Sequence, residues 1–194
     1  MSAPPFLFVT GNAGKLAEAR RIVGAALAAL EVDLPEIQSL DGGEVLAAKA
    51  DAALARAPRR PGGRLETPIV VEETSLEVAA WNGFPGPLVK WMLAAVGAEG
   101  IARAAAACGD ARAVARCALL WTDGERRVTG EGETRGTLVA PPRGERGFGW
   151  DPVFQPDGET RTYGELPDAA KDAIGHRGRA WRDLLARLAE SPSG

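Results

Sequence analysis

The chain has 194 residues, of which 45% are hydrophobic and 25% charged, with a formal net charge of −3. This length predicts one domain, residues 1–194, and the small negative charge argues against a nucleic-acid-binding or membrane-binding surface. The sequence has only two cysteines, and we expect no disulfides. We also expect a cytoplasmic protein, because no apolar run resembles a leader or a membrane span.

Hydrophobic periodicity predicts alternating strands and helices along the chain. The expected strands lie near residues 5–10, 30–34, 68–72, 75–80, 112–122 and 126–139. The expected helices lie near residues 13–28, 44–57, 87–96, 98–107 and 176–189. The last two strands form an antiparallel hairpin around Asp123-Gly124, residues 57–63 a surface loop, and residues 190–194 a frayed tail. This order predicts the α/β class, with a long mixed central sheet flanked by helices and a cleft.

The first turn of the chain, in "FVTGNAGKLAEA", joins an apolar strand to a helix whose first turn contains Lys15. A helix N-terminus carries about half a positive charge, so a lysine there is unfavourable unless an anion lies opposite. A strand, a glycine-rich turn and a helix entry with a lysine are typical of a phosphate site. The alternative is an exposed lysine on an ordinary turn.

Acidic residues follow two predicted strands, at Glu36 and at Glu72-Glu73. Neighbouring residues of a strand point to opposite faces, so we expect only one of Glu72 and Glu73 to face a given cleft. Together with Glu36, that carboxylate could hold Mg²⁺, which prefers a few carboxylates, water and phosphate oxygens. The alternative is that these glutamates are solvated.

Arginine replaces lysine almost throughout, since 19 of the 23 basic residues are arginine. The four lysines, Lys15, Lys49, Lys90 and Lys171, therefore mark positions where a compact ammonium is needed. Two more basic residues, His176 and Arg177, open the last predicted helix after Gly175, and again call for an acceptor.

Five segments in this order resemble the inosine/xanthosine triphosphate pyrophosphatase family: "FVTGNAGKLAEA", "VDLPEIQ", "VVEETSLEVAAWNGFPGPLVKWML", "GFGWDPVFQPDG" and "TYGELPDAAKDAIGHRGRAW". They extend over residues 6–182. The resemblance implies a cleft between two lobes, a homodimer, and Mg²⁺-dependent hydrolysis of ITP, dITP and XTP to the monophosphate and pyrophosphate. The partners that it implies are the nucleoside triphosphate substrate and a second copy of the chain.

The resemblance also assigns roles to residues. Metal ligands would be Glu36 and Glu73, and Glu73 and Lys15 would be catalytic. The triphosphate loop would be Thr10, Gly11, Asn12, Ala13, Gly14 and Lys15, with further substrate contacts from Lys49, Thr74 and Lys90. The residues around the purine would be Phe148, Gly149, Trp150, Asp151, Lys171, His176 and Arg177.

Two positions depart from the family pattern. Aspartate is usual where this chain has Glu73, which puts the catalytic rate in doubt, and serine is usual at Gly175, a change expected to be benign because both residues cap helices. Two alternatives therefore stay open: a related pyrophosphatase for other modified nucleotides, and a nucleotide-binding sensor with impaired catalysis.

Overall fold

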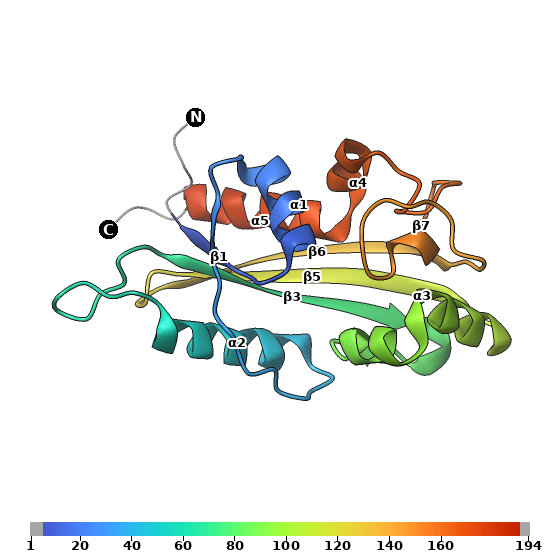
Figure 1. Cartoon of the computed structure of the whole chain (residues 1–194), viewed down its shortest axis with the longest axis horizontal. Helices are drawn as coiled ribbons and strands as arrows, with labels where there is room; N and C mark the ends of the chain where they lie inside the picture. Colours follow the sequence, from blue (N-terminus) through green and yellow to red (C-terminus); the bar gives the residue numbers. More distant parts are fainter. Residues whose placement is uncertain (1–5, 191–194) are drawn as a thin grey trace.

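The computed structural model describes residues 6–190, which form a mixed seven-stranded sheet with helices packed on it (Figure 1). The strand order is β2-β1-β3-β5-β6-β7, and β4 pairs with β3 off this path. The strands are β1 (Leu7–Val9), β2 (Ala28–Leu30), β3 (Ile69–Val78), β4 (Pro85–Gly86), β5 (Arg112–Thr122), β6 (Arg127–Leu138) and β7 (Phe154–Pro156).

Parallel and antiparallel pairing divide this sheet at β3. Strand β1 pairs in parallel with β2 and β3, whereas β3, β5, β6 and β7 pair antiparallel in turn. The β5–β6 hairpin turns at residues 123–126, which confirms the hairpin expected at Asp123-Gly124. The predicted α/β class and mixed sheet are confirmed.

Helices cover both faces of the sheet (Figure 1). Helices α1 (Ala13–Val23) and α5 (His176–Glu190) bury Phe8, Val70 and Leu119 on one face, where Trp181 of α5 packs, and α2 (Gly42–Arg56) packs over Ile69 and Val71 on the other. Helix α3 packs around the far end of β3 and β5. The helices are α1 (Ala13–Val23), α2 (Gly42–Arg56), α3 (Val89–Ala107), α4 (Asp168–Ile174) and α5 (His176–Glu190), with short 3₁₀ turns η1 (Ala79–Trp81) and η2 (Asp151–Val153).

Some predicted boundaries were wrong. The strands expected at 68–72 and 75–80 are one strand, because the polar residues between them keep their pairing with β5, as in Glu73 with Ala118. Strand β2 covers residues 28–30, not 30–34, and α1 ends before Gly24, whose φ of 137° is not helical. The break expected inside α3 is present at Gly97, which has a φ of 70°. Strands β4 and β7 and helix α4 were not predicted, and most of the expected tail, residues 191–194, lies outside the described residues.

Candidate active site

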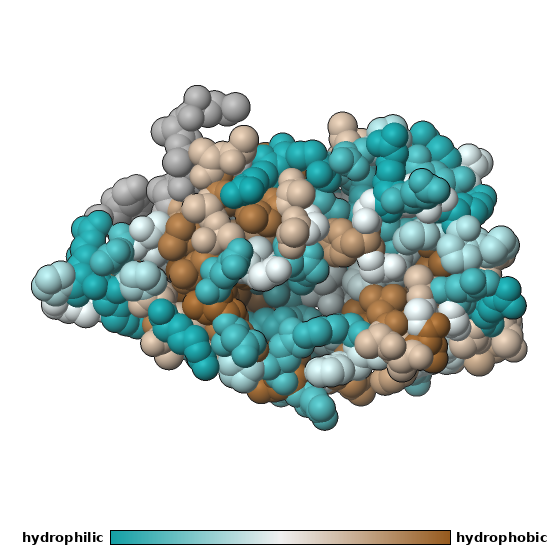
Figure 2. Space-filling view, viewed as in Figure 1, coloured by the Kyte–Doolittle hydropathy of each residue, from teal (hydrophilic) through white to brown (hydrophobic). Residues whose placement is uncertain are grey.

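A cavity of about 980 Å³ lies beside the middle of β3. Strand β1 pairs with β3 only as far as Val70, and β4 begins to pair at Leu76. In the described part of the chain, residues 71–75 therefore have no strand partner on this side, and the cavity opens along that edge. In Figure 2 the middle of this face is hollowed and largely hydrophilic, with hydrophobic side chains on either side.

Both Glu72 and Glu73 line this cavity, so the expectation that only one of them could do so was wrong. Their side chains do leave opposite faces of β3, because Glu73 contacts Lys49 of α2 and Glu72 contacts Lys15 of α1. The cavity lies at the open edge of the strand, however, and residues from both faces reach it. Alternation along a strand predicts the face but not the presence of such an edge.

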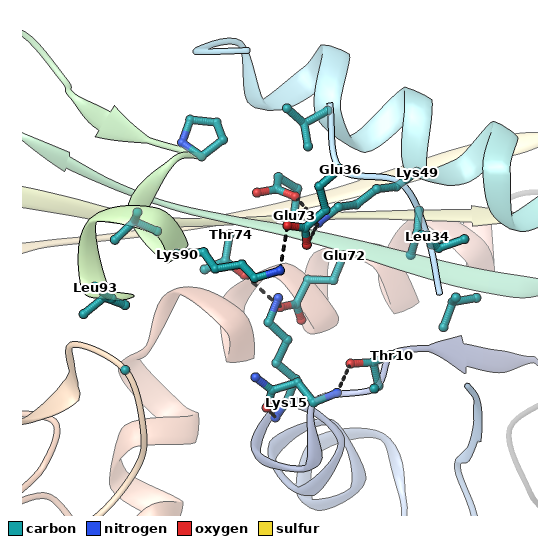
Figure 3. A pocket seen from close by; sticks show the side chains of 18 of the residues that line it. Thr10, Lys15, Leu34, Glu36, Lys49, Glu72, Glu73, Thr74, Lys90 and Leu93 are labelled. Carbon is teal, nitrogen blue, oxygen red and sulfur yellow. Dashed lines mark hydrogen bonds and ion pairs between the residues drawn. The ribbon is translucent and has the colours of Figure 1, made fainter. Parts of the chain in front are cut away.

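The α2 side of the cavity holds a cluster of two lysines and two glutamates (Figure 3). The Lys49 ammonium donates to Oε2 of Glu73 at 2.6 Å and lies 3.6 Å from Oε1 of Glu36. Lys90 donates to the other Glu36 oxygen at 2.8 Å. Burial alone would raise the pKa of Glu36, but the hydrogen bond from Lys90 and the charge of Lys49 lower it. Glu36 and Glu73, which are distant in sequence, thus meet at the ammonium of Lys49.

The predicted phosphate loop caps α1 with its own side chains. Asn12 Oδ1 accepts from the Lys15 backbone N–H at 3.0 Å, and Thr10 Oγ1 accepts from the Asn12 N–H at 3.1 Å. The Lys15 ammonium lies 3.1 Å from Oε1 of Glu72, so this carboxylate is the anion opposite the helix N-terminus. Thr10, Gly11, Asn12 and Lys15 line the cavity; Ala13 and Gly14 do not.

A buried ionic network lies behind this loop. Arg177 donates to Glu72 at 2.9 Å and also to Glu18, and Lys171 bridges Glu18 and Asp151. Desolvation would raise the pKa of Glu72 and of Glu18, but nearby positive charges outweigh it and lower both pKa values. These charges are Arg177 and Lys15 for Glu72, and Arg177 and Lys171 for Glu18. The five residues of this network are each at most 5% exposed.

Two members of the network differ from the sequence expectation. Lys171, expected beside the purine, does not line the cavity and supports Asp151 from behind. Glu18 was not predicted at all. Its only sequence signal is its place in α1 one turn after Lys15, beside the buried Ala19, where an unpaired acid would be costly.

The other end of the cavity is aromatic. His176 is 2% exposed, and its ring stacks near Trp150 and Tyr163, with centroids 6.2 and 5.9 Å away. Both imidazole nitrogens lack a hydrogen-bond partner among the described residues. Burial, and then the charge of Arg177, hold the pKa of His176 well below its usual value, so the ring is neutral near pH 7.

The segment 148–151 closes this end. Oδ2 of Asp151 accepts from the Phe148 N–H at 2.7 Å and from Lys171 at 2.6 Å, which fixes the loop to α4. Burial raises the pKa of Asp151 in spite of the Lys171 charge. Phe148, Gly149, Trp150 and Asp151 all line the cavity, as do Thr74, His176 and Arg177, so these predicted positions come together.

Gly175 joins α4 to α5, and the expected equivalence of glycine and serine there was wrong. Its carbonyl accepts from the Arg179 N–H at 3.0 Å, as an N-cap carbonyl does. A Cβ at Gly175 would lie 2.6 Å from the Lys171 carbonyl oxygen, closer than real Cβ atoms approach. The position is therefore constrained by packing as well as by capping.

The carboxylates fit Mg²⁺ only with help from a ligand. No group of three or more His, Cys, Asp or Glu residues that could hold a metal ion occurs within residues 6–190. Glu36 and Glu73 both contact the Lys49 ammonium, so two carboxylates with hard oxygen donors lie close together in the cavity. Mg²⁺ is usually bound by one or two carboxylates, with water and substrate phosphates supplying the other ligands, so this pair suffices.

Known proteins are similar to this chain in sequence and in fold. Residues 6–187 match the model of the Ham1 family, and the chain belongs to that family. It is 41% identical over 179 residues to an inosine triphosphate pyrophosphatase of Batrachochytrium dendrobatidis, covering 90% of this chain and 88% of the relative. It is also 41% identical over 189 residues to the inosine triphosphate pyrophosphatase of Yarrowia lipolytica, covering 95% of each chain.

Solved structures share the fold. A HAM1 protein from Coxiella burnetii superposes with a TM-score of 0.75 at 24% identity, over 96% of this chain and 98% of that one. The nucleoside-triphosphatase / dITP/XTP pyrophosphatase from Mycobacterium abscessus superposes with a TM-score of 0.64 at 26% identity, over 96% and 99%. Within the described residues, no helix is long and apolar enough to cross a membrane.

Proposed function

We propose that this protein hydrolyses inosine and xanthosine triphosphates (ITP, dITP and XTP) to the nucleoside monophosphate and pyrophosphate, and so removes them from the nucleotide pool. The observation that carries the proposal is the cluster in which Lys49 lies between Glu36 and Glu73. In this cluster, a lysine that could bind phosphate lies beside carboxylates that could hold a metal ion and accept a proton from water. Two relatives at 41% identity are named inosine triphosphate pyrophosphatases.

The triphosphate would bind between α1 and α2. Lys15, Lys49 and Lys90 each form an ion pair with a glutamate of the cavity. When anionic phosphates enter, the lysines can turn to phosphate oxygens. The helix dipole at the start of α1 favours the same charge.

The glutamates released by this exchange would hold Mg²⁺. We assign the ion to Glu36 and Glu73, which both contact the Lys49 ammonium. Bound there, Mg²⁺ would neutralise charge that develops on the leaving pyrophosphate. Lys15 of α1 would stabilise that charge from the other wall of the cavity.

Glu73 would take the proton of the attacking water. Its side chain is 8% exposed and projects from a central strand, so it is held rigidly. Water attack at the α-phosphorus, with pyrophosphate leaving, needs a base within hydrogen-bond distance of the water. Glu73 is the acid on β3 that faces α2, on the side where Glu36 also lies.

The purine would lie at the aromatic end, against Phe148 and Trp150. Neither ring nitrogen of the neutral His176 has a partner among the described residues, and its single N–H could donate to the oxygen at C6 of hypoxanthine or xanthine. Adenine has an amino donor at that position and would leave polar groups unpaired, which is costly in a buried site. We expect discrimination against ATP for this reason.

Pyrophosphate release from a panel of nucleoside triphosphates, with and without Mg²⁺, tests the proposal. We expect ITP and XTP to be cleaved with a much higher kcat/KM than ATP or GTP, and only with Mg²⁺. Equal kcat/KM values for ITP and ATP would refute it. Binding of ITP without pyrophosphate release would favour a sensor, and preference for another modified nucleotide a related pyrophosphatase.

We further propose a cytoplasmic homodimer. The side chains of Phe84, Trp91 and Val96 are 43%, 54% and 52% exposed, and such large apolar groups on and beside α3 suit a subunit interface. Light scattering on the purified protein checks the mass. A monomer at micromolar concentration would contradict the dimer but not the activity.

A further inference from the structure

The ring of Phe148 packs directly on the backbone of α1 at Gly14. A Cβ built at Gly14 would lie 2.5 Å from Cδ1, 2.8 Å from Cε1 and 3.1 Å from Cγ of that ring. Distances under 3.0 Å to a Cβ are not tolerated, so any other residue at 14 would displace the ring. Gly14 itself does not line the cavity, whereas Phe148 does.

Other contacts leave the ring little freedom to move aside. The Lys171 ammonium lies 5.1 Å and the Arg177 guanidinium 5.4 Å from its centroid, both within cation–π distance. Both cations are fixed by the buried acids Glu18 and Asp151. The Phe148 backbone is tied to Asp151. A side chain at 14 would therefore press on a ring that lines the cavity.

We infer that Gly14 is a specificity-determining position that acts through Phe148, and is not primarily a phosphate ligand. Because glycine has no Cβ, the Phe148 ring can pack against α1, and this contact determines the position of the ring at the purine end of the cavity. Glycine is a poor helix former, so helix propensity alone would favour alanine at this position of α1. This inference rests on the proposed function, because it requires a base to lie against Phe148.

Two partial ligands separate the ends of the cavity. Inosine monophosphate carries the base, whereas inorganic tripolyphosphate carries only phosphates. In Gly14→Ala we expect the Kd of inosine monophosphate to rise about tenfold, the range that loss of base stacking gives. We expect the Kd of tripolyphosphate to change less than twofold. Gly42→Ala is the control, since a Cβ there would meet only Pro87 at 3.7 Å.

A double-mutant cycle with Phe148→Ala tests the route of the effect. Phe148→Ala removes all three ring atoms that the new Cβ would meet, so adding Gly14→Ala to it should change the inosine monophosphate Kd less than twofold. Additive effects, an equal loss of tripolyphosphate binding, or no change in Gly14→Ala would each overturn the inference. If the wild-type protein neither bound inosine monophosphate nor cleaved ITP, the proposed function itself would fail, and this inference with it.

Discussion

Lys15 and Glu72 form an ion pair across the cavity, with 3.1 Å between Nζ and Oε1, and the lysine side chain is only 22% exposed. The lysine in the first turn of α1 thus already has an anion opposite it. Glu72 does not depend on this lysine alone, because Arg177 and Thr74 also donate to it. The pair can therefore open toward a phosphate without leaving Glu72 uncompensated.

Lys15→Ala should raise the KM for ITP tenfold or more while costing about 1 kcal/mol or less in unfolding free energy, since partly exposed ion pairs contribute little. Steady-state kinetics and urea unfolding measure the two effects. Arg21→Ala is a matched control, because Arg21 is also on α1 and pairs with Asp172. A large loss of stability with unchanged KM and kcat would show that Lys15 is structural.

The sequence predicted the fold class because its long elements are strongly periodic. The β5–β6 hairpin and α5 are long, with apolar stripes that local pattern reveals. Strand β4, two residues long, and β7, three residues long, depend on pairing with the strand that precedes each of them. Segments this short show no hydrophobic periodicity in the sequence, so they can be identified as strands only from their pairing in the folded sheet.

Within the site, residue type was more informative than local geometry. The rare lysines identified Lys15, Lys49 and Lys90, which do converge on the cavity. The same argument could not tell that Lys171 is buried behind Asp151, since exposure depends on how α4 packs. Glu18 was missed because one acid in an ordinary helix looks solvated until its partners from α4 and α5 are known.

Gly175→Ser should destabilise the protein by about 1–3 kcal/mol, the usual cost of forcing atoms into a packed site. The new Cβ would lie 2.6 Å from the Lys171 carbonyl, so α4 or α5 must shift. Thermal and urea unfolding test this, with Gly11→Ser as the control because a Cβ at Gly11 meets nothing within 4 Å. Unchanged or increased stability would mean that the α4–α5 junction relaxes freely.

The single histidine should make stability depend on pH between about 7 and 5. In the folded state the pKa of His176 is held well below 6.5, whereas the unfolded chain takes up a proton on this residue near pH 6.5. The unfolded state then binds more protons, so stability falls as pH falls, by up to about 1.4 kcal/mol per pH unit.

His176→Gln should remove that slope, whatever it costs in overall stability. Urea unfolding at several pH values between 5 and 7 compares the two proteins. The lowered pKa values of Glu18 and Glu36 also make the protein less stable as the pH falls. Their effect begins at lower pH, because this stabilisation is lost only as the pH falls below about 4.5. An identical slope in the variant would show that the pKa of His176 is the same in the folded and unfolded protein.

The last prediction concerns Glu73, where the chain has one methylene more than the aspartate usual in the family it resembles. The longer side chain brings Oε2 to 2.6 Å from Lys49, and Lys49 in turn reaches Glu36. The partners of Glu73 are therefore placed for glutamate. Glu73→Asp would withdraw the carboxylate from them by about one bond length, and a displacement of about 1 Å can cost on the order of 10²-fold in rate.

We accordingly expect Glu73→Asp to lower kcat for ITP by about 10- to 100-fold. Glu73→Gln, which keeps the shape but removes the negative charge, should nearly abolish turnover while the fold remains intact by circular dichroism. Glu77→Gln is the matched control, because Glu77 projects from the same face of β3 but pairs with Arg116 outside the cavity. A tenfold gain in kcat for Glu73→Asp would mean that the natural glutamate impairs catalysis, and full activity in Glu73→Gln would remove this residue from the mechanism.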